Sequence, residues 1–229
     1  MCQIFGPLLR SAAVASAFAF PLAQAATVID FEPAALTGLY LPADTFVQGG
    51  YTLTTKNDFG IIDTAAALGG VSPTGNATQF YFNANDGALS LARTDTAAFS
   101  LEGFSAAFVP LDPASTQVTV IVATGTKLDN SVVTASWTFA SSLTSHYAFG
   151  SYAGPAAFAP FTGLAKVEFR ACSWVGGVAC TQATQDNGQF AIDDILVSAV
   201  PEPTITVLMT LGLLGLGVGL RLPARRNAR

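Results

Sequence analysis

Residues 117–124 read QVTVIVAT and residues 165–172 read AKVEFRAC, and these two stretches decide the predicted fold class. In the first, every second residue from Val118 to Val122 is a valine; in the second, Val167 and Phe169 alternate with charged residues. Alternation with a period of two places successive side chains on opposite faces of a strand, whereas a helix repeats every 3.6 residues. Both stretches therefore predict β-strands.

The same pattern recurs through residues 26–199, where few stretches have helical periodicity. Glycine, proline, asparagine and aspartate interrupt it at residues 49–50, 73–75, 85–87, 110–113 and 186–188, as turns require. About nine short strands with such turns predict an all-β domain, an antiparallel β-sandwich of the jelly-roll type. The predicted strands are Thr27–Phe31, Phe46–Thr54, Gln79–Asn83, Ala88–Arg93, Ala98–Phe108, Gln117–Thr124, Val132–Phe139, Ala165–Cys172 and Gln189–Ser198.

The last thirty residues have a different character. A short motif, Pro201-Glu202-Pro203, precedes seventeen uncharged residues, Thr204–Leu220, and four arginines follow at positions 221, 225, 226 and 229. At about 1.5 Å per residue, a helix of this run would be about 26 Å long, near the lower limit for crossing a bilayer. The arginines are expected to stay cytoplasmic, which places the residues before Pro201 outside the cytoplasm.

The N-terminus predicts export independently. Arg10 is followed by an apolar segment, Ser11–Phe20, and then by Ala23-Gln24-Ala25, an A-x-A cleavage signal. Cleavage between Ala25 and Ala26 by the Sec-type export pathway is expected. The predicted organisation is a signal peptide at 1–25, an ectodomain at 26–199 and a sorting segment with one transmembrane helix at 200–229.

The Pro201–Pro203 motif, the apolar run and the arginine cluster, in this order at the end of the chain, resemble the PEP-CTERM sorting signal of exopolysaccharide-producing Gram-negative bacteria. The resemblance covers about Val200–Arg229 and implies an exosortase that cuts near the motif and releases or re-attaches the ectodomain at the cell surface. Such tails also carry a name that refers to ice-binding proteins, which implies no ice affinity here. Residues 189–193, QFAID, are similar to the QFxxD motif of one group of PEP-CTERM proteins.

Charge limits the partners of the ectodomain. Between Ala26 and Val200 the chain has fourteen acidic and five basic residues, a net charge near −9, whereas the whole chain carries −5. Nucleic-acid binding requires clustered lysine and arginine, so nucleic acid is excluded as a partner. An acidic surface suits cation binding or solubility.

Two cysteines remain after signal cleavage, Cys172 and Cys180. They flank Gly176-Gly177, which predicts a tight turn that would bring them together across a hairpin. Outside the cytoplasm a disulfide is favoured over two free thiols, and a metal site would need more ligands than this pair offers.

Acidic residues within apolar strands mark both ends of the ectodomain, in VIDFE at 28–32 and in QFAIDDILV at 189–197. If the first and last strands are neighbours, Asp30 or Glu32 approaches Asp193 or Asp194, and a cation would relieve their repulsion. The similarity of these ends to MAM domains and carbohydrate-binding jelly rolls implies a structural Ca²⁺ site at Glu32, Asp193 and Asp194. The alternative interpretation is a β-bulge whose carboxylates accept backbone N–H bonds.

Catalytic motifs are scarce in the sequence. His146 is the only histidine, and no G-x-S-x-G, P-loop, GxGxxG or CxxC motif occurs. The leading expectation is a non-catalytic protein of the cell surface or extracellular matrix. The alternative is a carbohydrate-binding module that retains exopolysaccharide, with Trp174 at a hairpin tip as the stacking aromatic. A third hypothesis is a hydrolase with an unrecognised site.

Overall fold

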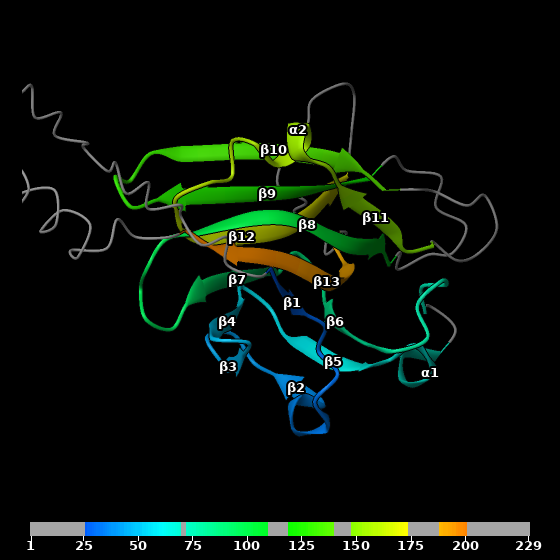
Figure 1. Ribbon diagram of the computed structural model, residues 1–229. Helices are drawn as coiled ribbons and strands as arrows, with labels where there is room; N and C mark the ends of the chain where they lie inside the picture. Colours follow the sequence, from blue (N-terminus) through cyan, green and yellow to red (C-terminus); the bar gives the residue numbers. More distant parts are fainter. Residues whose placement is uncertain (1–25, 70–71, 110–118, 140–147, 174–187, 201–229) are drawn as a thin grey trace, which may run out of the picture. The chain divides into compact units, whose positions relative to one another are not determined.

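The computed structural model describes residues 26–69, 72–109, 119–139, 148–173 and 188–200 (Figure 1). These residues belong to one compact unit, Gln24–Val200. The predicted signal peptide and the predicted membrane helix lie outside the described residues. Within the described ranges, no helix has the length and apolar character needed to cross a membrane.

Strands dominate the described part of the chain, and the helices in it are single turns. The elements, in chain order, are β1 (Thr27–Ile29), the 3₁₀ turn η1 (Ala34–Leu36), β2 (Gly38–Tyr40), β3 (Thr45–Gln48), β4 (Tyr51–Lys56), β5 (Gly60–Thr64), α1 (Ala65–Leu68), β6 (Gln79–Asn83), β7 (Ala88–Arg93), β8 (Phe99–Phe108), β9 (Thr119–Lys127), β10 (Val132–Thr138), β11 (Gly150–Ala153), α2 (Pro155–Phe158), β12 (Leu164–Ser173) and β13 (Phe190–Ala199).

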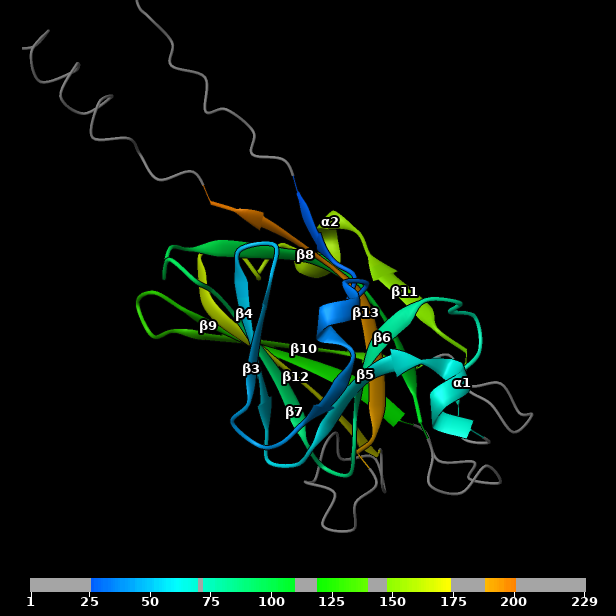
Figure 2. The same ribbon diagram turned by 90° about the horizontal axis from the view of Figure 1, so that it is seen from below.

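Hydrogen bonds join these strands into one nearly closed antiparallel sheet, in the order β2-β5-β6-β13-β8-β12-β7-β4-β3. Strands β1, β11 and β9–β10 attach beside β13, β8 and β12, respectively (Figures 1 and 2). The two ends of the path meet through side chains, because the rings of Tyr40 on β2 and Phe46 on β3 lie 4.7 Å apart. An all-β, antiparallel, sandwich-like domain is therefore confirmed, and the jelly-roll assignment is a finer statement that the pairing does not establish.

One large apolar core fills the space that the sheet encloses. Its buried members come from β3 at one end of the path and from strands along it, including Phe46, Tyr81, Phe104 and Phe169, all at most 6% exposed. Tyr40 on β2, at the other end, is partly buried against them. A second, smaller cluster lies on the other face of β5, β6 and β13, where α1 covers it. Strand β13 is therefore packed on both faces, which explains its almost continuous apolar sequence.

Several strand predictions need correction. The predicted strand Phe46–Thr54 is a hairpin, β3 and β4, because Gly49 and Gly50 turn the chain with φ of 58° and 83°. Strands β2, β5 and β11 were not predicted; they are three to five residues long, and their sequences GLY, GIIDT and GSYA show no clear alternation of apolar and polar residues. The predicted neighbourhood of the first and last strands is confirmed, since Ile29 pairs with Ile195.

Candidate functional site

Strand β13 changes its buried face at Asp193 and Asp194. Phe190 and Ile192 point into the main core before these aspartates, and Ile195 and Val197 point into it after them. A strict period of two cannot place both pairs on one face, so one extra residue must be inserted between them. The pairing shows it, because the register of β13 on β8 shifts between Asp193 and Leu196. The bulge interpretation of this acidic pair is therefore confirmed.

A compensating irregularity lies on β8. Gly103 pairs with Leu196 and Leu101 with Val197, so here the extra residue belongs to β8. The buried face of β8 accordingly changes from Phe99 and Leu101 to Phe104 and Ala106. Two opposed bulges let both strands keep apolar residues inside while they bend.

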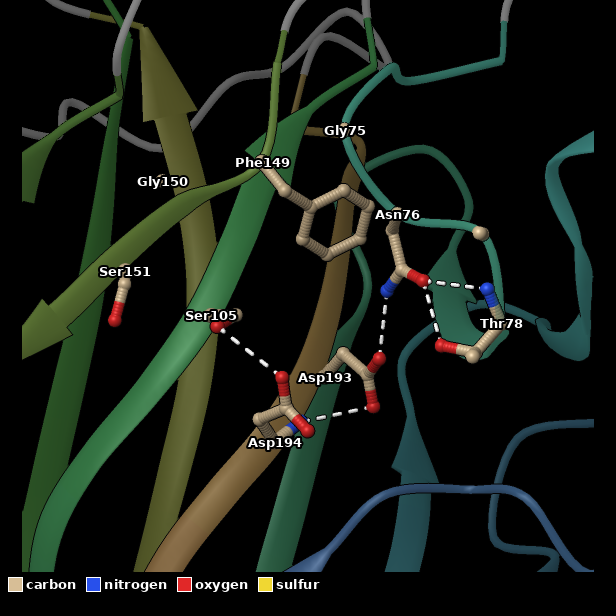
Figure 3. A pocket seen from close by; sticks show the side chains of 10 residues that line it. Gly75, Asn76, Thr78, Ser105, Phe149, Gly150, Ser151, Asp193 and Asp194 are labelled. Carbon is tan, nitrogen blue, oxygen red and sulfur yellow. Dashed lines mark hydrogen bonds between the residues drawn. The ribbon is translucent and has the colours of Figure 1, made fainter.

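The bulge buries the Asp193 carboxylate, whose residue is 2% exposed. Asn76 donates from Nδ2 to Asp193 Oδ2 at 2.6 Å, and the backbone N–H of Asp194 donates to Asp193 Oδ1 at 2.8 Å (Figure 3). Asn76 is itself fixed, because its Oδ1 accepts from the N–H and the hydroxyl of Thr78 at 2.8 and 2.7 Å. Both donors to the carboxylate are neutral.

Burial raises the pKa of Asp193 from 3.8 to about 7, and the nearby charges of Asp194 and Glu32 push it in the same direction. The hydrogen bonds from Asn76 and from the Asp194 backbone oppose this rise in pKa without cancelling it. A carboxyl group that titrates near neutrality is therefore held under the surface at the bulge.

Asp194 takes a different conformation and a different environment. It is exposed, and its φ of 47° lies in the left-handed region, which aspartate and asparagine tolerate better than most residues. Its carboxylate turns toward β8, where Ser105 Oγ donates to Oδ2 across 3.5 Å. The two consecutive carboxylates thus diverge, one toward Asn76 and one toward Ser105 (Figure 3).

A polar pocket of about 290 Å³ opens above the bulge. The loop at Gly75–Thr78 forms one wall, and the start of β11 with Phe149 forms another. The floor is a row across three strands, because Ser151 on β11 pairs with Ser105 on β8, which pairs with Asp193 on β13. Among the described residues, ten line the pocket, and none of these is a lysine, arginine or histidine. This pocket is the candidate functional site.

The three carboxylates predicted to bind calcium are not gathered into one ligand group. Within the described part of the chain, no three His, Cys, Asp or Glu side chains lie close enough together to hold a metal ion. Glu32 instead accepts the backbone N–H of Gln79 at 3.1 Å, although its charge acts on Asp193. The described residues therefore do not form the ligand set that the calcium prediction requires.

Other predicted residues lie at or beyond the limits of the described chain. Cys172 is buried and disulfide-bonded, and its partner lies outside the described residues, so the pairing with Cys180 stays a prediction. Trp174, His146, Ala25 and the motif Pro201-Glu202-Pro203 also lie outside them, and Ala26 is the first described residue.

Of the ten described lining residues, only Asp193 and Asp194 were predicted from the sequence as site residues. Asn76 stands in Asn76-Ala77-Thr78, where the Asn-x-Thr spacing allows the observed local turn but does not reveal the distant partner Asp193. Ser105 and Phe149 reach the site only through the pairing of β8 with β11 and β13. No local pattern could have identified them.

Comparison with known proteins supports the fold alone. No family model and no curated protein matches the chain. A solved DUF4465 family protein from Bacteroides caccae ATCC 43185 superimposes with a TM-score of 0.50 at 13% identity, covering 77% of this chain and 100% of that one. The enzymatically active domain of tailspike protein 4 of bacteriophage CBA120 gives a TM-score of 0.28 at 13% identity over 75% of this chain and 20% of that one, too low to support an argument.

Proposed function

We propose that this chain is an exported protein of a Gram-negative bacterium that an exosortase processes and delivers to the cell surface or the extracellular matrix. The observation that carries the proposal is the order of elements in the tail: Pro201-Glu202-Pro203, the uncharged run Thr204–Leu220 and the arginines that end the chain. The A-x-A signal before Ala26 supports export from the other end. The Sec-type machinery and the exosortase are its proposed partners.

The ends of the domain are compatible with loss of both segments. Thr27 pairs with Val197, so the two points at which the predicted segments leave the domain are adjacent. The last strand ends at Ala199, and Val200 donates one more backbone bond to Ala98 at 3.1 Å. A cut at Pro201–Pro203 would therefore leave in place all the strands that the structure describes and the hydrogen bonds between them.

The proposed role of the ectodomain is non-catalytic. A glycosidase needs two carboxyl groups that face each other across the substrate. Asp193 and Asp194 are instead consecutive on one strand, and their carboxylates diverge, the first toward Asn76 and the second toward Ser105. This arrangement is better suited to holding a ligand than to transferring protons across one.

The tail motif can be tested by replacing Pro201, Glu202 and Pro203 with alanine in the native host. The expected result is an uncut form that stays in the membrane fraction, detected by blotting against the ectodomain. Pro223→Ala is the matched control, because it removes a proline on the other side of the apolar run. Unchanged processing and release of the triple variant would refute the sorting role.

A further inference from the structure

The pocket above the bulge is rich in hydrogen-bond acceptors. Ser151, Ser105 and Asp193 lie in register on three neighbouring strands, and Asp194 follows Asp193 in the bulge and turns its carboxylate toward Ser105. The Asp194 carboxylate receives a single long side-chain hydrogen bond of 3.5 Å from the described residues. Most of its capacity to accept hydrogen bonds is therefore available to a ligand.

The electrostatics of the pocket favour a cation. Asp194 is exposed at the pocket, Asp193 lies beneath it, and none of the lining residues that the structure describes is basic. The charge near −9 on the ectodomain acts in the same direction. The two carboxylates disfavour anionic ligands such as phosphates or uronates.

An organic cation fits better than a metal ion. Calcium requires six to eight oxygen ligands, and the described residues offer no group of three carboxylates or other strong ligands. A protonated amine needs only about three acceptors, which Asp194 and the hydroxyls of Ser105 and Ser151 can supply. Phe149 adds an aromatic wall, and its ring is braced by Phe80 at a centroid distance of 5.3 Å.

The size and the remaining polar groups narrow the ligand class. A volume of about 290 Å³ is at the lower end of the range for ligand pockets, so the pocket suits a ligand of about one ring and not a larger one. Besides the proposed ammonium acceptors, Thr78 and the backbone at Gly75 and Gly150 line the pocket. Such mixed donors and acceptors suit a ligand with several hydroxyl groups.

We propose that this pocket binds the protonated amine of a small hydroxylated ligand, of the amino-sugar class, with the Asp194 carboxylate as the partner of the ammonium group. The proposal does not depend on the sorting tail, because every residue that it uses lies between Gly75 and Asp194. It differs from the stacking site predicted at Trp174 in the residues that it uses and in the group that is recognised.

The decisive experiment is calorimetric titration of the full chain, purified in a nonionic detergent at pH 6, with D-glucosamine and with D-glucose. The two sugars differ only in the amine, so the charged contact is isolated. We expect saturable binding of glucosamine and binding of glucose that is at least about tenfold weaker, because charge-assisted hydrogen bonds are about twice as strong as neutral ones.

Asp194→Asn is the matching variant, since asparagine also tolerates the left-handed conformation and keeps the side-chain shape. It should weaken glucosamine binding about tenfold and leave glucose unchanged. Asp129→Asn is the control, because it makes the same change at an exposed turn between β9 and β10. Equal affinity for the two sugars, no saturable binding of glucosamine, or an Asp194→Asn variant that binds glucosamine like the control would each overturn the proposal.

Discussion

Glu168 on β12 and Asp193 on β13 are acidic side chains of one sheet, and both strands pair with β8. Glu168 has a 19% exposed side chain and two cationic neighbours, Arg170 at 2.6 Å and Lys56 at 3.7 Å. Asp193 is 2% exposed, and its carboxylate accepts its side-chain hydrogen bond from the neutral amide of Asn76. The first charge is compensated at the surface, whereas the second is buried and compensated only by dipoles.

The comparison shows that Asp193, unlike Glu168, is kept at a cost in the free energy of unfolding. A partly exposed ion pair contributes little to the free energy of unfolding, and its loss is tolerated. A buried carboxyl group without a cation is costly and persists where a bend or a site requires it. Asp193 lies at a bulge and under a pocket, so it meets both conditions.

The largest expected effect comes from Asn76→Asp. The change removes the donor to Asp193 and places a second carboxylate where a hydrogen bond of 2.6 Å now exists. We expect a loss of about 5 kcal/mol in the free energy of unfolding at pH 8, measured by urea denaturation, and a smaller loss at pH 5, where the two groups can share a proton.

The double variant Asn76→Asp with Asp193→Asn is the control for this prediction. It restores one carboxylate and one amide with their positions exchanged. The new amide oxygen at position 193 can still accept the N–H of Asp194, while the amide nitrogen donates to the new carboxylate at position 76. Most of the lost stability should return. If the double variant is as unstable as the single one, the hydrogen-bond arrangement at the bulge is not the reason for the loss.

The next effect is a dependence of stability on pH. The folded pKa of Asp193 is raised from 3.8 to about 7, so the folded state binds its proton more tightly than the unfolded state. Stability therefore decreases as pH rises from about 4 to about 7 and then levels off, by at most about 4 kcal/mol from this group. Thermal unfolding across this pH range should show a decline that Asp193→Asn abolishes; a decline of equal size in that variant would assign it to other groups.

The smallest effect is expected at the compensated position. Glu168→Gln removes an ion pair whose members are partly exposed, so we expect a change below about 1 kcal/mol in the free energy of unfolding, reduced further in high salt. A loss at Glu168 as large as that of Asn76→Asp would contradict the contrast between the two strands.

The sequence predicts the sheet better than the site, for a physical reason. Alternation in β12 is a local signal, because it depends only on the backbone geometry of a strand. The Gly49-Gly50 turn is also local, although the predicted strand Phe46–Thr54 ran through it. The pocket depends on register: Ser151 and Asp193 are 46 and 88 residues from Ser105 along the chain, and only pairing brings the three into a row.

The acidic pair of β13 was predictable only in part. A doubled aspartate in an apolar strand signals an irregularity. The change of buried face from Ile192 to Ile195 is seen only in the structure, because residues 190–192 and 195–197 are all apolar. Which partner satisfies Asp193 is not visible, because Asn76 approaches from a loop 117 residues away. The calcium prediction followed from acidic residues that do lie near one another but, within the described ranges, do not converge on one point.

The burial of the Asp193 carboxyl group beside neutral donors is tested most directly by measuring its pKa. Carboxyl carbons of aspartate report protonation by ¹³C NMR, and comparison of the wild type with Asp193→Asn identifies the resonance. A midpoint near 7 is the predicted result, because the carboxyl group is buried beside a neutral amide and near two other carboxylates. A midpoint near 4 would show a well-solvated or charge-compensated carboxylate and would contradict the buried, dipole-held aspartate on which the contrast with Glu168 depends.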